Sequence, residues 1–162
     1  MGKVVLMDAN AIIGANKYGV WEQLRGRFVL ETVEMCVVEC ASGDPGGWGY
    51  VPVDTRALRT QIRVHDVTQM QIIAAYMENP ALRTVHEGER DLLVHALGRA
   101  DAWLLTSQDK GCLKCSHELG FLDRMVSLEE LARETGNRIK FEDPYSRKWL
   151  DVRRADIRLG VL

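Results

Sequence analysis

The feature that most constrains the fold is an alternation of short apolar runs with longer, helix-like segments. Five runs have the composition of buried strands: 4–7, 28–30, 63–67, 103–106 and 125–126. Helices are predicted between and after them: 11–25, a helix capped by Thr32, 54–62, 68–77, 88–100, 111–119, a helix from Ser127 to Gly136, and a terminal helix capped at Asp143-Pro144. Because parallel strands need crossover connections, the alternation predicts a three-layer α/β/α sandwich with a central, mainly parallel sheet.

Length and composition fit one globular domain. The chain has 162 residues, of which 46% are hydrophobic and 27% charged. No apolar run approaches the ~20 residues that span a bilayer, and the first eight residues do not form a signal-peptide core. We therefore expect a soluble, cytoplasmic protein without membrane contacts.

Charge is distributed unevenly. The segment 137–162 has a net charge of +3, whereas 1–136 has −5. We expect 1–136 to be the functional domain and 137–162 a basic extension, a helix packed on the same domain. Such an extension could contact a phosphate backbone or an acidic partner, although a solvated helix face is the simpler interpretation for each residue.

Two aspartates follow predicted strands. Asp8 stands between the apolar runs 4–7 and 11–13, and Asp109 follows 103–106 by three residues. In an open α/β sheet, active sites lie beyond the carboxyl ends of the strands. If the two strands are neighbours, both carboxylates emerge at one edge.

Three further acids could reach the same edge. Glu39 interrupts the apolar segment MCVVEC, and Glu89 and Asp91 lie in the first turn of a predicted helix. Taken singly, each has an ordinary explanation, such as complementing a helix dipole. Together, four or five carboxylates at one edge require a cation, and oxygen ligands suit Mg²⁺ or Mn²⁺. The chemistry that follows is metal-assisted hydrolysis of phosphodiester bonds.

These residues match an ordered set of motifs that resembles the PIN-domain family of metal-dependent nucleases. The matching pieces cover residues 3 to about 130: Asp8-Ala9-Asn10 after the first strand, Glu39 in a helix, G-E-R-D at 88–91 and L-L-T-S-Q-D at 104–109.

The resemblance implies an endoribonuclease that uses Mg²⁺ or Mn²⁺. Carried over by position, the metal-site acids are Asp8, Glu39 and Asp109, with either Glu89 or Asp91 as the remaining acid, and Asp91 slightly preferred. Asn10 and Thr106 or Ser107 match positions that support the acids. RNA is the implied substrate. Many relatives are toxins of toxin–antitoxin pairs, so an antitoxin and pairing of two copies are implied partners.

The glycine-rich stretch 42–50 is the clearest predicted loop. It lacks the Gly-Lys-Ser/Thr sequence of a phosphate-binding loop. Its aromatic residues, Trp48 and Tyr50, could stack on a base, although an ordinary surface connection is the simpler interpretation.

Three alternatives bear on function. A haloacid-dehalogenase-type phosphotransferase needs an aspartate at position 10, where this chain has Asn10. A zinc-stabilised binding module would need its four thiols to converge, but buried core cysteines are the stronger interpretation for the helical pair. These thiols belong to Cys36, Cys40, Cys112 and Cys115. The third alternative is a catalytically inert PIN-like domain that binds RNA or serves in assembly.

Overall fold

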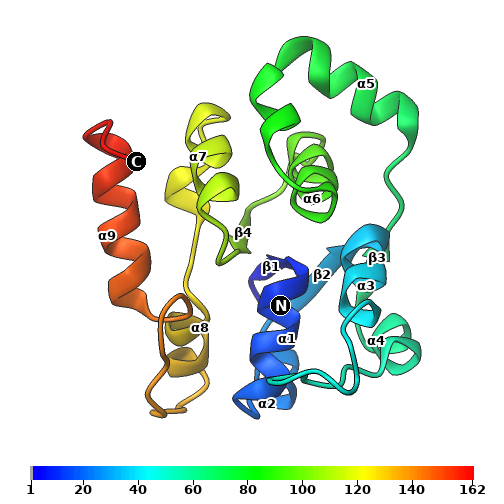
Figure 1. Cartoon of the computed structure of the whole chain (residues 1–162), viewed down its shortest axis with the longest axis vertical. Helices are drawn as coiled ribbons and strands as arrows, with labels where there is room; N and C mark the ends of the chain where they lie inside the picture. The colour runs from blue at the N-terminus through cyan, green and yellow to red at the C-terminus, as the bar shows by residue number, and fades with distance from the viewer. Residues whose placement is uncertain (1) are drawn as a thin grey trace.

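The computed structural model describes residues 2–162 and shows an α/β protein built on one parallel sheet (Figure 1). Its four strands are β1 (Val4–Met7), β2 (Val29–Val33), β3 (Arg63–His65) and β4 (Trp103–Thr106), in the spatial order β3-β2-β1-β4. All three pairings are parallel. The predicted three-layer α/β/α class is confirmed.

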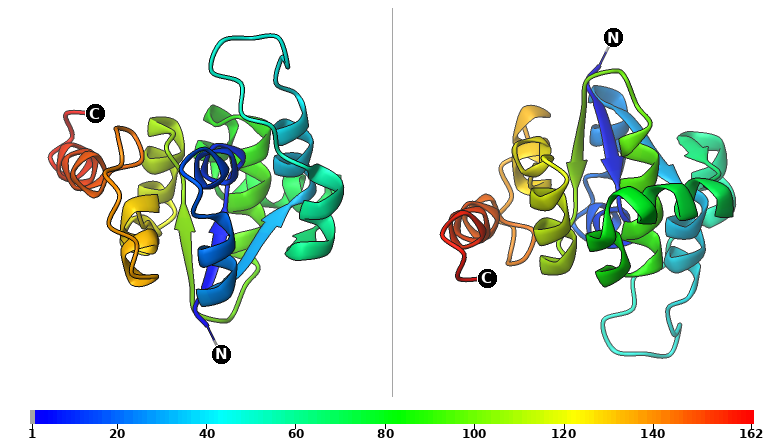
Figure 2. Two further views of the ribbon diagram at one scale, coloured as in Figure 1. Left: turned by 90° about the horizontal axis from the view of Figure 1, so that it is seen from below. Right: turned by 90° about the horizontal axis from the view of Figure 1, so that it is seen from above.

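Nine α-helices connect and follow the strands within residues 2–162. They are α1 (Ala9–Lys17), α2 (Trp21–Arg27), α3 (Glu34–Ala41), α4 (Thr55–Gln61), α5 (Gln69–Glu78), α6 (Glu87–Leu97), α7 (Lys110–Glu118), α8 (Leu128–Glu134) and α9 (Arg147–Arg158). Short 3₁₀ turns lie at Pro80–Thr84 and Leu122–Arg124. Figure 2 shows α1 and α2 on one face of the sheet and α6 on the other.

The core forms where the central strand β1 lies between both helical layers. Val5, Leu6 and Met7 are fully buried, as a strand covered on both faces requires. Leu6 pairs with Leu105 of β4, and Met7 pairs with Thr106. The two strands therefore end together, and the residues that follow them emerge side by side.

The predicted helix over 11–25 is wrong as a single element. The chain forms α1 and α2 instead, separated by a turn in which Gly19 has φ +67°. This left-handed conformation is readily accessible to glycine and ends the first helix. The break lets α2 turn back toward β2, which it contacts.

The predicted helix cap at Thr32 is also wrong. Strand β2 continues through Thr32, whose buried hydroxyl donates a hydrogen bond of 2.6 Å to the carbonyl of Met7. Helix α3 begins only at Glu34. The hydroxyl thus holds together the carboxyl ends of β1 and β2.

The C-terminal segment differs in detail from expectation. The pair 125–126 contributes a single parallel bridge, between Met125 and Leu105. The terminal helix α9 begins at Arg147, because the Ser146 side chain, not Asp143, accepts from the Trp149 N–H at 3.1 Å.

Helix α9 packs against α7 and α8. Several of its basic side chains hold it to the rest of the chain: Arg154 donates to the Met125 carbonyl, and Arg158 pairs with Asp123. Arg158, and Arg147 through Glu130, are therefore paired with acids outside the segment 137–162. Within residues 2–162, no helix has the length and apolar character needed to cross a membrane.

Candidate active site at the carboxyl edge of the sheet

Asp8 occupies the junction between β1 and α1. Its Oδ1 accepts from the Ala11 N–H at 2.7 Å, so the side chain caps α1. The side chain is 1% exposed, and Oδ2 has no hydrogen-bond partner. Burial raises the pKa of Asp8 from 3.8 to about 7; the nearby Ser107 hydroxyl and the Ala11 N–H offset part of this rise, and the charges of Glu89 and Asp109 add to it.

Asp109 lies across from Asp8 because β4 is the neighbour of β1. The Asp8 N–H donates to the Thr106 carbonyl at 3.4 Å, which joins the two strand ends. Asp109 caps α7, accepting from the Cys112 N–H at 2.8 Å, and its own N–H donates to the Ser107 hydroxyl at 3.3 Å. The two aspartates are thus N-caps of two helices that start at the same edge of the sheet.

Glu89 comes to this edge from the first turn of α6. It is buried, and its Oε2 has no hydrogen-bond partner. Burial raises the pKa of Glu89, and the charges of Asp109 and Glu39 raise it further. Glu89 is therefore electrostatically coupled to both of these acids.

Glu39 reaches the same region from α3. Its Oε1 accepts from the Gly88 N–H at 3.0 Å, which links the end of α3 to the start of α6. Burial raises the pKa of Glu39 against the lowering effects of that hydrogen bond and of His86. A Cβ at position 88 would collide with the Glu39 carboxylate, so the position of that carboxylate against the Gly88 N–H depends on glycine.

Asp91 is placed differently. Its carboxylate accepts from Arg90 at 2.9 Å, and the same guanidinium donates to the Tyr76 hydroxyl on α5. Burial nevertheless raises the pKa of Asp91. Since Arg90 already balances its charge, Asp91 is less available than Glu89 to a cation.

The N-termini of three helices meet at the acids. Helices α1 and α7 begin directly after Asp8 and Asp109, and Glu89 lies in the first turn of α6. Helix N-termini favour negative charge, which offsets part of the repulsion among the carboxylates. The two unpartnered oxygens, on Asp8 and Glu89, remain uncompensated.

The supporting residues have different roles. Asn10 is exposed and lines an open cavity of about 440 Å³ together with Glu39, Glu89 and His86. Thr106 is fully buried, and its hydroxyl accepts from the Gln108 amide at 3.3 Å.

The cysteines are buried thiols in the core. Cys36 contacts the Gly88 carbonyl at 3.5 Å, and Cys40 contacts the Ala9 carbonyl at 3.8 Å. Burial raises the pKa of all four cysteines, which disfavours the thiolate that zinc requires. This environment supports the interpretation as core residues.

A second group with metal-ligand chemistry was missed from the sequence. Potential ligand atoms of Glu31, His65 and His95 all lie within 4.8 Å of one another, and within residues 2–162 this is the one such group of three; the carboxylates around Asp8 do not reach that spacing. The sequence feature that could have indicated this group is Glu31, an acid inside the apolar strand segment 28–33.

Arg99 already occupies this second group. Its Nη1 lies 2.9 Å from Glu31 Oε1 and 3.0 Å from His95 Nε2. Burial alone would raise the pKa of Glu31, but hydrogen bonds from Arg99 and His65 hold it below its usual value. Burial and the nearby cations lower the pKa of His95 to about 4. A cation would have to displace the guanidinium, so this is a satisfied ion-pair network.

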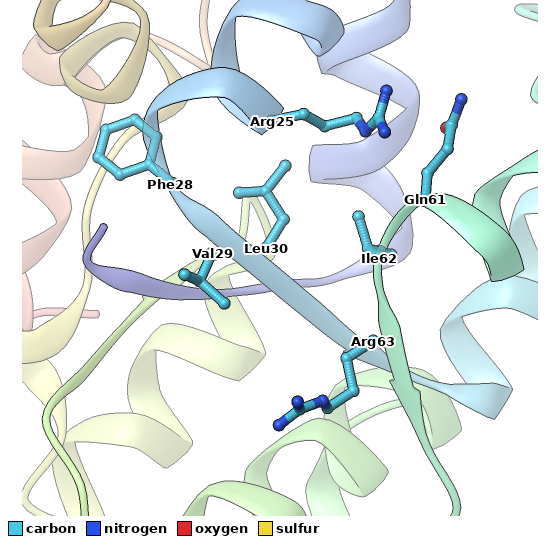
Figure 3. A pocket seen from close by; sticks show the side chains of 7 residues that line it. All are labelled: Arg25, Phe28, Val29, Leu30, Gln61, Ile62 and Arg63. Carbon is cyan, nitrogen blue, oxygen red and sulfur yellow. The ribbon is translucent and has the colours of Figure 1, made fainter. Parts of the chain in front are cut away.

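A surface pocket of about 370 Å³ lies away from the acids. It is lined by Arg25, Gln61 and Arg63 and by the apolar residues Phe28, Val29, Leu30 and Ile62 (Figure 3). It contains no carboxylate, and its two guanidiniums would repel a cation. The pocket therefore has no role in a metal site.

A scan against protein-family models and a search of curated proteins each found no match to this chain.

Proposed function

We propose that the chain is an endoribonuclease of the PIN type that hydrolyses RNA phosphodiester bonds with Mg²⁺ or Mn²⁺ bound at Asp8, Glu89 and Asp109. The observation that carries this proposal is a pair of buried carboxylate oxygens that have no hydrogen-bond partner and lie near other acids. They are Asp8 Oδ2 and Glu89 Oε2. Buried charges are costly unless they are paired or coordinate a metal.

The donor set suits a hard divalent cation. Mg²⁺ prefers oxygen ligands and keeps several waters, so one or two direct carboxylates suffice and others can act through water. These acids lie farther apart than three ligands that all contact one ion. This spacing is compatible with binding in which some of the carboxylates act through water. When bound, the ion would lower the pKa of an attacking water and offset charge on the phosphate.

Each side chain at the site would have a separate role. Asp8 and Asp109 are fixed by their capping hydrogen bonds, so their second oxygens are held in place. Glu39 is oriented by the Gly88 N–H. His86, on the wall of the cavity, could donate to a phosphate oxygen.

Glu89 is the third acid in this proposal, although the sequence slightly favoured Asp91. The support is electrostatic: Glu89 is coupled to Asp109 and Glu39, whereas Asp91 is paired with Arg90. The preference follows from the partner of each carboxylate, which the sequence does not reveal.

The test is cleavage of a mixed cellular RNA pool by purified protein with Mg²⁺, with Mn²⁺ and with EDTA. We expect metal-dependent cleavage that Asp8→Asn abolishes. The matched control is Asp54→Asn, the same substitution at another helix N-cap, where the aspartate is exposed and accepts from the Ala57 N–H at 3.0 Å. It should retain activity.

Two results would overturn the proposal. Cleavage that persists in EDTA or in Asp8→Asn would point to a contaminating or metal-independent nuclease. Metal-dependent RNA binding without cleavage by the wild type would instead favour the inert, RNA-binding alternative.

A further inference from the structure

The loop between α3 and α4 projects from the same side of the molecule as the acids. Helix α3 carries the chain past the carboxyl end of β2, and the loop 42–54 extends beyond it, on the side opposite the N-terminus (Figure 2). It begins three residues after Glu39, where the Ser42 hydroxyl donates to the Glu39 carbonyl at 2.7 Å. The loop is therefore anchored directly to an acid-bearing helix.

Trp48 is completely exposed in this loop, at 104% of its reference area. Two other tryptophans, Trp21 and Trp103, are buried in the core. The indole is the largest apolar side chain and normally buries much of its surface. Its full exposure leaves the indole free to contact another molecule.

Turns within the loop hold the backbone beside Trp48. The Gly46 N–H donates to Asp44 Oδ1 at 3.0 Å, and the Gly47 N–H donates to the Asp44 carbonyl at 2.9 Å. Gly49 follows with φ +77°. Because glycines flank the indole on both sides, its two faces are not covered by neighbouring side chains.

The surroundings of Trp48 indicate what kind of molecule it would contact. A stable protein interface buries ~800 Å² on each partner around a contiguous apolar centre. The residues that flank Trp48 are glycines, and the other aromatic ring of the loop, Tyr50, is 38% exposed and lies against Gly43. A single aromatic ring is sufficient to stack on one nucleobase, whatever its identity.

We propose that Trp48 stacks on an unpaired base of single-stranded RNA whose phosphate lies at the acids, an inference that rests on the proposed function. The loop would hold a nucleotide flanking the scissile bond. It would thus select unpaired over double-stranded substrate, because a paired base has no free face.

The test compares Asp8→Asn with Asp8→Asn/Trp48→Ala in binding a short single-stranded RNA and the same backbone with abasic sites, in Mg²⁺. We expect Trp48→Ala to weaken RNA binding about 5- to 150-fold, the range for loss of one stacked base. The abasic backbone should bind both proteins equally. Trp48→Phe, which keeps an aromatic ring, should retain most of the affinity.

Fluorescence gives a second, local readout. Acrylamide should quench Trp48 strongly in free Asp8→Asn, and the RNA should protect it, whereas the abasic backbone should not. Equal RNA affinity with and without Trp48, or a loss that persists with the abasic backbone, would overturn the stacking proposal. If Trp48→Ala alters only self-association in gel filtration, the ring belongs to a protein contact and the proposal is wrong.

Failure of the proposed function can be distinguished from failure of the stacking proposal. Wild-type protein that binds the RNA through Trp48 but never cleaves it with Mg²⁺ or Mn²⁺ would refute the nuclease and leave the stacking contact established. Wild-type protein that cleaves, with kcat and KM unchanged by Trp48→Ala, would support the nuclease and refute the contact. Absence of both binding and cleavage would refute both.

Discussion

Replacing Asp8 by asparagine should stabilise the metal-free protein at neutral and higher pH. The burial of Asp8 raises its pKa from 3.8 to about 7, so folding takes up a proton between these values. A carboxyl group with a raised folded-state pKa leaves stability unaffected below pH 4. It lowers the free energy of unfolding progressively as the pH rises from 4 to 7, and above pH 7 the whole reduction is present.

The magnitude follows from the size of the shift. At 1.36 kcal/mol per pH unit, ionised Asp8 costs the fold at most about 4 kcal/mol above pH 7. Asparagine removes that cost and can still accept the 2.7 Å hydrogen bond from the Ala11 N–H, since it is an equally good helix cap. We therefore expect Asp8→Asn to be more stable at pH 8 by up to about 4 kcal/mol, with a difference that shrinks toward pH 4.

The assay is urea unfolding between pH 4 and 8 in EDTA, with Asp54→Asn as the control because it makes the same change at an exposed helix N-cap. Adding Mn²⁺ should narrow this difference. The wild type gains about 2.7 kcal/mol at an ion concentration 100 times Kd, and Asp8→Asn gains less. A variant no more stable than the wild type at pH 8 in EDTA would refute the account of Asp8 as a buried, uncompensated carboxylate.

Four further substitutions probe the site and its support. Gly88→Ala should displace the Glu39 carboxylate and reduce cleavage without lowering stability, because the added methyl meets the flexible end of that side chain; unfolding at a much lower urea concentration would contradict this. Glu89→Gln should weaken Mn²⁺ binding measured by calorimetry more than Asp91→Asn does, and the reverse order would restore Asp91 as the third acid. Thr32→Val should lower the free energy of unfolding by about 1–3 kcal/mol, since it leaves a buried carbonyl without its partner; an unchanged urea midpoint would argue against that bond.

The sheet and its edge were predictable because they follow from local apolar patterning. The run 4–7 followed directly by an acid placed Asp8 beyond a buried strand, and 103–106 did the same for Asp109. The pairing of β1 with β4, which brings the two aspartates together, was a condition that the sequence did not settle. It depends on tertiary packing.

The wrong predictions have physical causes that the local sequence pattern does not show. Thr32 has the residue type of a helix cap, but its hydroxyl instead satisfies a carbonyl 25 positions away. Gly19 broke a helix whose apolar spacing continued past it. The preference for Glu89 over Asp91 stays a proposal, and it rests on the contact of Arg90 with Asp91, which spacing alone does not determine.

The most direct test of the central claim is the position of Mn²⁺ in crystals of the wild-type protein, located by anomalous diffraction. The proposal predicts a peak between Asp8 Oδ2 and the carboxylates of Glu89 and Asp109, lost in crystals of Asp8→Asn. A peak at Glu31, His65 and His95 with none beside Asp8 would contradict it, as would the absence of a peak at Mn²⁺ concentrations that support cleavage.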